Sequence, residues 1–212
     1  NMAFLVGGAN TTADDAYVVA NSCRFDGSSA YLAKTPDSNG TSKTFTISVW
    51  IKRCKLGATQ TIFSNGDMSD GNPRVVLGFN SSDQLDFLNY ESGVSGRLVS
   101  EQKFRDTSAW YHVLVNMDTT ESTAGDRMRM YINGTEVTVF DTDTNPDEDA
   151  DSEFAKDERP MEIGIAYGND EYFDGYMAEY CVIDGSQLAA SSFGEFDEDS
   201  PTIFKPKDVS GL

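Results

Sequence analysis

The chain has 212 residues, of which 35 are Asp or Glu and 16 are Lys or Arg, so its formal charge is −19. A field of that sign repels phosphate backbones and anionic lipid, which argues against nucleic acid and membrane surfaces as partners. Cations and neutral ligands such as sugars remain possible partners. The length is typical of one all-β domain with a sizeable core.

The three cysteines, Cys23, Cys54 and Cys181, have no metal-like spacing, so neither a disulfide framework nor a zinc site is predicted. One disulfide with a leftover thiol and three free cysteines both remain open. Residues 2–6 are apolar but lack a basic flank, so they are not predicted to be a signal peptide. No run approaches the ~20 apolar residues of a membrane span.

Residues 1–21 are rich in Gly, Asn and Asp and are predicted to form an N-terminal extension. Short strands are then expected at 22–25, 30–35, 44–52, 61–64, 74–79, 84–90 and 96–104. The strand at 44–52 alternates most regularly, with Phe45, Ile47, Val49 and Ile51 on one side. Because its other side carries Trp50, that second face is predicted to be partly covered.

The element from Asp106 to Phe140 holds two more alternating strands and the only histidine, His112. One side of these strands is apolar, with Tyr111, Val113, Val115 and Met117 in the first and Met128, Met130 and Ile132 in the second. Asn133-Gly134 predicts a type I′ hairpin turn, since both central residues of that turn need positive φ.

The acidic segment from Asp141 to Glu158 has nine acidic residues and one basic residue, so it is predicted to be a long exposed loop outside the core. Strands are expected at 161–167 and 172–185, a short helix from Gln187 to Phe193, and an extended C-terminal tail at 196–212. Short strands at roughly ten-residue spacing without helical crossovers indicate a sandwich or barrel, which is assigned here to residues 22–195.

Several motifs together resemble one family: Trp110-Tyr111-His112-Val113, Tyr131-Ile132-Asn133-Gly134, Ile163-Gly164 and Phe173-Asp174-Gly175-Tyr176-Met177-Ala178-Glu179. Their order and spacing are similar to the laminin G-like, or pentraxin-like, branch of concanavalin A-like lectin and glucanase domains, from about Cys23 to Gly185. The resemblance implies a jelly-roll sandwich of two antiparallel sheets. Residues 31–36 and 193–195 are further similar to laminin G-like domains of bacteriophage virion proteins, particularly tail-fibre or surface proteins of marine phages.

Catalytic chemistry finds little support in the sequence. His112 lies in mid-strand, where a histidine is usually packed and hydrogen-bonded, and no second histidine or Gly-x-Ser-x-Gly elbow accompanies it. The glucanase branch of the resembled fold uses Glu-x-Asp-x-x-Glu. The similar stretch from Glu195 to Ser200 fails at its last position and lies in the expected tail. No catalytic residue is therefore predicted, and the protein is predicted not to be an enzyme.

Calcium is the cofactor that the acidic loops suggest. Asp141-x-Asp143-x-Asn145 has the oxygen spacing of an EF-hand, but Pro146 stands where that loop needs Gly and Ser152 where it needs Glu. Members of the resembled family hold calcium with oxygens from separate loops. The candidates are Asp67, Asp70, Asn72, Asp141, Asp143 and Asp147, and a solvated acidic loop is the alternative.

Sugar recognition needs an exposed aromatic ring beside Asp, Asn or backbone groups that bind hydroxyls. The turn-proximal candidates are Tyr90, Asn89, Tyr167, Asn169, Asp170 and Tyr172, with core or interface packing as the alternative for each.

The first hypothesis is a non-enzymatic phage surface protein, on the virion and extracellular, that binds a host-surface polysaccharide. A second is a capsid decoration or fibre-assembly protein whose tail binds other virion proteins, with a homo-oligomer as one arrangement. A third is a polysaccharide hydrolase with an unrecognised acidic pair.

Overall fold

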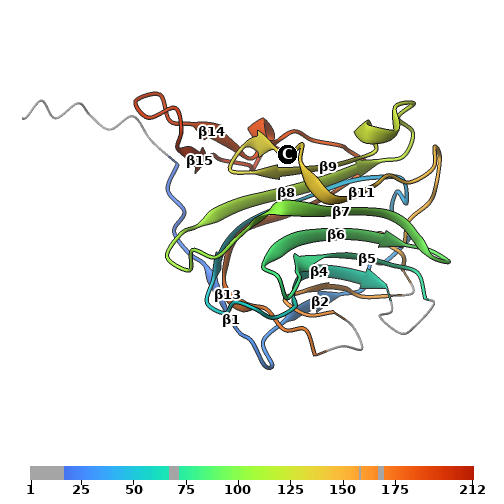
Figure 1. Cartoon of the computed structure of the whole chain (residues 1–212), viewed down its shortest axis with the longest axis horizontal. Coiled ribbons are helices and arrows are strands. Elements are labelled where there is room, and N and C mark those ends of the chain that lie inside the picture. The colour runs from blue at the N-terminus through green and yellow to red at the C-terminus, as the bar shows by residue number, and fades with distance from the viewer. Residues whose placement is uncertain (1–16, 67–71, 158, 167–169) are drawn as a thin grey trace, which may run out of the picture.

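The computed structural model describes residues 17–66, 72–157, 159–166 and 170–212. Two antiparallel sheets pack face to face, as Figure 1 shows, which confirms the predicted jelly-roll sandwich. The sheet that contains β3 is called sheet A here. Its strands, in spatial order, are β1 (Cys23–Asp26), β13 (Asp174–Asp184), β3 (Thr44–Arg53), β8 (Tyr111–Asp118), β9 (Met128–Ile132) and β10 (Thr135–Glu136).

The second sheet, sheet B, has seven strands. In spatial order they are β11 (Phe140–Thr144), β7 (Val94–Lys103), β6 (Gln84–Tyr90), β5 (Arg74–Phe79), β4 (Gln60–Gly66), β12 (Met161–Ile163) and β2 (Leu32–Lys34). The only helical segments among the described residues are two 3₁₀ turns, η1 (Ala124–Asp126) and η2 (Ala190–Ser192). Strands β14 (Gly194–Phe196) and β15 (Phe204–Pro206) form a separate C-terminal pair.

The core lies between the inner faces of the two sheets, and the alternation found in the sequence selects its members. Phe45, Ile47, Val49 and Ile51 of β3 are each 0 % exposed, as predicted. The apolar sides of β8 and β9 join the same cluster, opposite phenylalanines and aliphatic residues of β4 to β7. Burial of this much apolar surface is the main stabilising term of the sandwich.

The predicted hairpin joins β9 to β10. Asn133 has a φ of 48° and Gly134 a φ of 79°, as a type I′ turn requires. The residues that follow β13, 185–212, are called the C-terminal segment here. A side chain at Gly134 would collide with the ring of Phe204 in this segment, so the turn also contacts the C-terminal segment.

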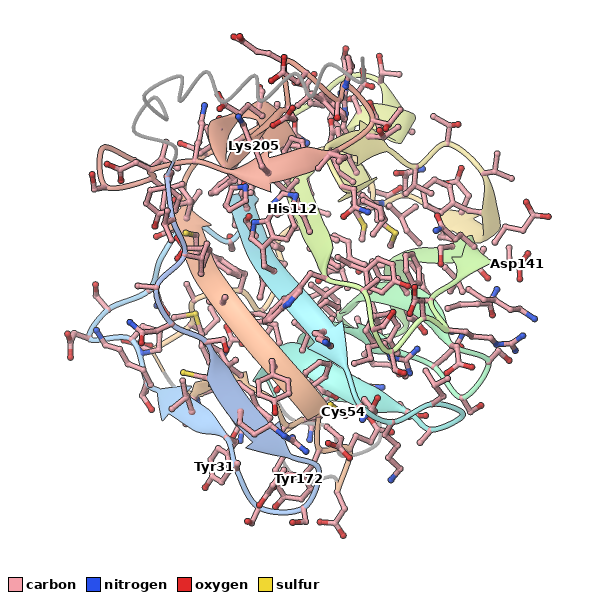
Figure 2. All side chains as sticks on the ribbon, turned by 90° about the vertical axis from the view of Figure 1, so that its left-hand side faces the viewer. Tyr31, Cys54, His112, Asp141, Tyr172 and Lys205 are labelled. Atoms are coloured by element: carbon pink, nitrogen blue, oxygen red, sulfur yellow. The ribbon has the colours of Figure 1, made fainter. Side chains whose placement is uncertain are left out.

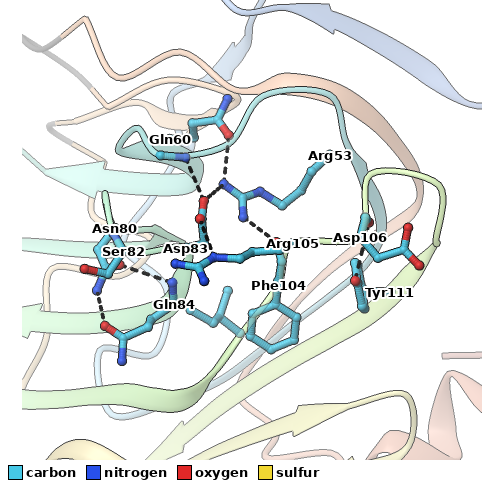
Figure 3. Close-up of polar contacts among 12 residues, drawn as sticks. Arg53, Gln60, Asn80, Ser82, Asp83, Gln84, Phe104, Arg105, Asp106 and Tyr111 are labelled. Carbon is cyan, nitrogen blue, oxygen red and sulfur yellow. Dashed lines mark hydrogen bonds and ion pairs between the residues drawn. The ribbon is translucent and has the colours of Figure 1, made fainter.

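A buried ion network fixes the connections at one end of the sandwich (Figure 3). Arg53 is 0 % exposed; its Nη2 lies 3.1 Å from Oδ1 of Asp83, and its Nη1 donates to the Phe104 carbonyl at 2.6 Å. Asp83 also accepts from Gly57 N–H at 2.8 Å and from Nε of Arg105 at 3.1 Å. The loops that follow β3, β5 and β7 are therefore tied to one carboxylate.

The acidic segment from Asp141 to Glu158 departs from the exposed loop that was predicted. Its first residues continue β11, which pairs with β7, and Phe154 is 1 % exposed and stacks on Phe45 at 4.0 Å. The prediction was wrong for these parts because an edge strand can turn its carboxylates to solvent while pairing its backbone. Further along the segment, Ser152 and Ala155 are also buried, and the Ser152 N–H donates to the Ser42 carbonyl at 2.9 Å.

The C-terminal segment lies against the outer face of sheet A, the face turned away from the core (Figures 1 and 2). Strand β15 within it carries Phe204, which is only 8 % exposed, so the segment is packed rather than an extended tail. The short helix expected from Gln187 to Phe193 is reduced to the 3₁₀ turn η2. Whether residues 196–212 form a separate unit stays a prediction.

Candidate functional site

The two outer faces of the sandwich differ in what covers them. The outer face of sheet A forms a second apolar cluster with the C-terminal segment, made of Trp50, Leu114, Tyr131, Ala178, Ala190, Phe193 and Phe204. This is the partly covered second face that Trp50 predicted.

His112 belongs to that covered face. Its Nε2 lies 2.9 Å from the Ser48 hydroxyl, and its ring lies 5.2 Å from that of Trp50 and 5.1 Å from that of Phe204. Figure 2 shows it beneath the C-terminal strand that carries Lys205. Burial lowers its pKa to about 4, so the imidazole is neutral at physiological pH and fully enclosed. The arrangement is that of a packed strand histidine, as the sequence indicated.

No described segment covers the outer face of sheet B over β5, β6 and β7 in the same way (Figure 1). Cross-strand pairs point to the same side of a sheet, and three successive rows reach this face: Gly66–Arg74–Tyr90, Ser64–Val76–Leu88–Arg97 and Thr61–Gly78–Asp86. A groove of about 130 Å³ opens there. It is lined by Thr59, Gln60, Thr61, Arg74, Val76, Gly78, Phe79, Asn80, Asp86, Leu88 and Glu171. We call it the sheet B groove.

Two arginines contribute polar groups on this face: Arg74 lines the sheet B groove, and Arg97 binds the lining residue Asp86. The guanidinium of Arg97 is bidentate to the Asp86 carboxylate, with Nε–Oδ1 at 3.0 Å and Nη2–Oδ2 at 2.5 Å. The guanidinium of Arg74 lies 4.1 Å from the ring centroid of Tyr90, and its Nη1 donates to the Asn72 carbonyl at 2.9 Å. Both groups are held in place before any ligand arrives, which lowers the entropic cost of binding.

Of the residues predicted to bind sugar, Tyr90 lies on this face. Its neighbour Asn89 points to the opposite side, is 0 % exposed, and bonds Ser95 at 2.9 Å, so it does not join Tyr90. Asp170 is exposed and Tyr172 half-buried, in the segment that leads into β13. Only Glu171 between them lines the groove. The candidates Tyr167 and Asn169 lie outside the described residues.

The calcium candidates are not assembled in the described part of the chain. There, no group of three or more His, Cys, Asp or Glu side chains is placed to hold a metal ion. Asn72 precedes β5, whereas Asp141 and Asp143 lie on β11, three strand positions away across sheet B.

Those candidates also have other partners. The Asp141 carboxylate accepts from the Gln84 side chain, Asp143 accepts from Asn145 at 3.0 Å, and the Asn72 carbonyl faces the positive charge of Arg74. Asp147 is exposed in the acidic segment. These four residues do not fit calcium as one site. Asp67 and Asp70 lie outside the described residues, so a calcium site that includes them stays a prediction.

A second hollow lies at the margin of the covered face. This cavity of about 390 Å³ is lined by Val19, Ala20, Asn21, Ser22, Trp50, Trp110, Ala178 and Pro206, and is called the Trp110 pocket here. The sequence around Trp110 and His112 predicts that both rings pack within the sandwich, but Trp110 is 39 % exposed, so for Trp110 this prediction was wrong. Its ring lies 6.5 Å from that of Tyr176.

The sequence reasoning missed Arg74, Asp86 and Glu171, which line the sheet B groove, and Arg97, which pairs with Asp86. The alternation in 74–79 and 84–90 already places Arg74 and Asp86 on the polar side of their strands. Their convergence depends on the register between β5, β6 and β7, which no local pattern encodes.

The family model for the concanavalin A-like lectin/glucanases superfamily matches residues 26–190. The chain belongs to this superfamily. A search of curated proteins finds no match. Among the described residues, no helix is long and apolar enough to cross a membrane.

Solved structures share the fold of this superfamily member at low identity. Domains LG4-5 of the mouse laminin alpha1 chain align with a TM-score of 0.53 and 17 % identity, over 93 % of this chain and 47 % of that one. A Trypanosoma rangeli sialidase in complex with the inhibitor DANA aligns with a TM-score of 0.50 and 17 % identity, over 83 % and 27 %. A heptameric SAP-like pentraxin from Limulus polyphemus aligns with a TM-score of 0.49 and 17 % identity, over 76 % and 74 %.

Proposed function

We propose that the chain is a non-enzymatic carbohydrate-binding domain whose ligand lies in the sheet B groove. The observation that carries this proposal is a groove on the outer face of sheet B whose charged lining residues are already oriented, Arg74 by the ring of Tyr90 and Asp86 by the guanidinium of Arg97. Membership of a lectin and glucanase superfamily supports the proposal.

The groove offers the two kinds of contact that sugars use. Val76 and Leu88 are half-buried side by side and present an apolar floor to the C–H face of a sugar ring. The Arg97–Asp86 pair offers donors and acceptors in one plane beside that floor, so hydroxyl groups can be bound without further ordering of side chains. Tyr90 supports Arg74 at the end of the groove.

An array of neutral and acidic oligosaccharides, probed with the wild type and two variants, tests this assignment. Tyr90→Ala removes the ring under Arg74, and we expect it to weaken binding about tenfold or more, at unchanged circular dichroism. Trp110→Ala is the matched control, since it removes an aromatic ring from the other face. Lost binding in Trp110→Ala with full binding in Tyr90→Ala would transfer the site to the Trp110 pocket.

The proposal extends to location: a bacteriophage virion surface, where the domain binds a host-surface polysaccharide as an adhesion module. Its support is the similarity of residues 31–36 and 193–195 to laminin G-like domains of phage virion proteins. Immunogold labelling of purified particles tests it, and label on a fibre tip is the expected result. Label spread over the capsid shell would favour a decoration role instead.

A role of the C-terminal segment in binding other subunits is less well supported, because Phe193 and Phe204 pack on the chain's own sheet A.

A hydrolase would need a pair of carboxylates, and Asp86 and Glu171 line the sheet B groove. Asp86 is already bidentate to Arg97, which does not suit a nucleophile or an acid. Reducing-sugar release that disappears in Glu171→Gln would establish an enzyme and overturn this part of the proposal.

A further inference from the structure

Within the described part of the chain, Arg74 has no carboxylate partner, although this protein is strongly acidic. In a chain with 35 acidic residues, six described arginines each form an ion pair with Asp or Glu. These pairs are Arg24–Asp174, Arg53–Asp83, Arg97–Asp86, Arg105–Asp83, Arg127–Glu148 and Arg129–Asp126. Arg74 forms no ion pair with any residue in the described part of the chain.

Arg53 and Arg74 have similar surroundings but differ in whether a carboxylate pairs with them. Both guanidinium groups lie over an aromatic ring, Arg53 at 4.0 Å from the centroid of Phe79 and Arg74 at 4.1 Å from that of Tyr90. Both also donate to a backbone carbonyl. The Nε of each is buried without a hydrogen-bond acceptor. Arg53, however, also pairs with the Asp83 carboxylate, as Figure 3 shows, whereas Arg74 has no carboxylate partner among the described residues.

The structure therefore holds a guanidinium in place, leaves donors of it unused, and points it to a groove. A buried donor without an acceptor is costly, and a guanidinium fork matches a carboxylate in a bidentate manner. We propose that the ligand of the sheet B groove is an acidic sugar whose carboxylate binds Arg74. This inference rests on the proposed function, since it names the class of glycan that the same groove would take.

The charges of the groove give this ligand a direction. Arg74 pairs with Gly66 on β4, while Glu171 lies beside Thr61, whose N–H donates to the Glu171 carbonyl at 2.9 Å. Thr61 pairs with Gly78, four residues along β5 from Arg74, which separates the two ends by about 13 Å. The carboxylate is placed at the Arg74 end, and the sugar hydroxyls that donate hydrogen bonds are placed toward Glu171.

The net charge of −19 opposes an anionic ligand only at long range. At physiological ionic strength the Debye length is about 8 Å, so charges beyond the groove are largely screened. Within the groove, Arg97 neutralises Asp86 at contact distance and leaves Arg74 as the local cation. The short-range contact therefore decides the binding.

The experiment compares carboxylated polysaccharides with the same polymers after chemical reduction of their carboxyl groups. Alginate, polygalacturonate and hyaluronan are immobilised, each beside its carboxyl-reduced form, together with neutral galactan, mannan, β-glucan and dextran sulfate. We expect the wild-type chain to bind a carboxylated polymer, and to bind its carboxyl-reduced form with an affinity at least about tenfold lower.

Two variants assign that preference to a residue. Arg74→Gln is expected to abolish the preference for the carboxylated polymer. Arg24→Gln, the matched control, removes an arginine that lies 5.3 Å from the ring centroid of Tyr176 on the other sheet, and is expected to retain it. Unchanged thermal denaturation of both variants shows that each remains folded.

The outcomes separate this inference from the proposed function. Equal binding of the reduced and carboxylated forms, or of neutral polymers, would overturn the acidic-sugar assignment and leave carbohydrate binding intact. If dextran sulfate bound as tightly as the carboxylated polymers, the groove would have a general preference for anions. The assignment of a carboxylate as the group that Arg74 binds would then be overturned. Absence of binding to every polymer would contradict the proposed function itself.

Discussion

The outer faces of sheet A and sheet B belong to the same sandwich but differ in what packs on them: the C-terminal segment covers the first, and a groove opens on the second. On sheet A, aromatic and apolar side chains gather under the C-terminal segment and form a second core around Trp50 and Phe204. On sheet B, half-buried aliphatic residues alternate with charged ones over β5 to β7, and a groove remains. Covering a face adds stability, whereas an uncovered face with oriented charges is available to a ligand.

The covered face predicts the largest change in stability. Phe204→Ala removes a ring that contacts Trp50, His112 and Phe196, and we expect the free energy of unfolding to fall by about 3 kcal/mol. Chemical denaturation measures this, with Phe196→Ala as the control because Phe196 is 44 % exposed. Equal losses in the two variants would mean that the C-terminal segment is not packed as a core. Sugar binding should persist in both.

Acid should weaken the same face through His112. Burial lowers the pKa of this imidazole from 6.5 to about 4, so the unfolded chain takes up the proton first. The stability that His112 contributes is full above pH 6.5 and is lost as the pH falls from 6.5 to 4, by roughly 3 kcal/mol.

The His112→Gln variant isolates this contribution. It should have a lower melting temperature at pH 7 but lack the part of the acid-induced decline that His112 causes, while its sugar binding stays unchanged. Parallel stability curves for wild type and variant between pH 7 and pH 4 would show that His112 is not buried as a neutral group. Lost sugar binding at unchanged stability would make His112 part of a binding site.

The end of sheet B should show a smaller effect of the opposite sign. Glu91, in the turn between β6 and β7, has its pKa raised to about 7 by burial and by the charges of Glu153 and Asp151. Since the folded-state pKa is the higher one, stability is full below pH 4.5 and is lost as the pH rises through 7.

Glu91→Gln removes that loss. After allowance for solvent screening, the variant should be more stable than wild type by about 1 kcal/mol at pH 8 and equal to it at pH 4. Melting temperatures at the two values measure the difference. A variant that is less stable than wild type at pH 8 would show that the Glu91 carboxylate has a favourable partner there.

Local alternation was sufficient to predict the sandwich. The sides of β3, β8 and β9 and the turn at Asn133-Gly134 follow from periodicity and from the φ that this turn needs. Composition failed for the acidic segment, because its charge hid Phe154 and the strand pairing of β11. A count of charges does not show which backbone groups find partners.

The site was predicted less completely because it depends on contacts between distant segments. Tyr90 was selected with Asn89, although neighbours on a strand point to opposite faces, a conflict that periodicity alone would have shown. Trp110 lines a pocket with residues 19–22 and Pro206, contacts between distant segments that its local sequence does not show. Arg74 is notable only because no carboxylate among the described residues pairs with it, which local sequence patterns do not show.

One NMR titration tests most directly that the uncovered face binds the ligand. The two tryptophans of the chain, Trp50 and Trp110, both belong to the Trp110 pocket on the sheet A side, and their indole N–H signals report on it. The methyl groups of Val76 and Leu88 report on the sheet B groove. With the tightest-binding oligosaccharide of the array as titrant, the account predicts shifts of both methyl sets and stationary indole signals. Shifted indole signals with stationary Val76 and Leu88 methyls would contradict it.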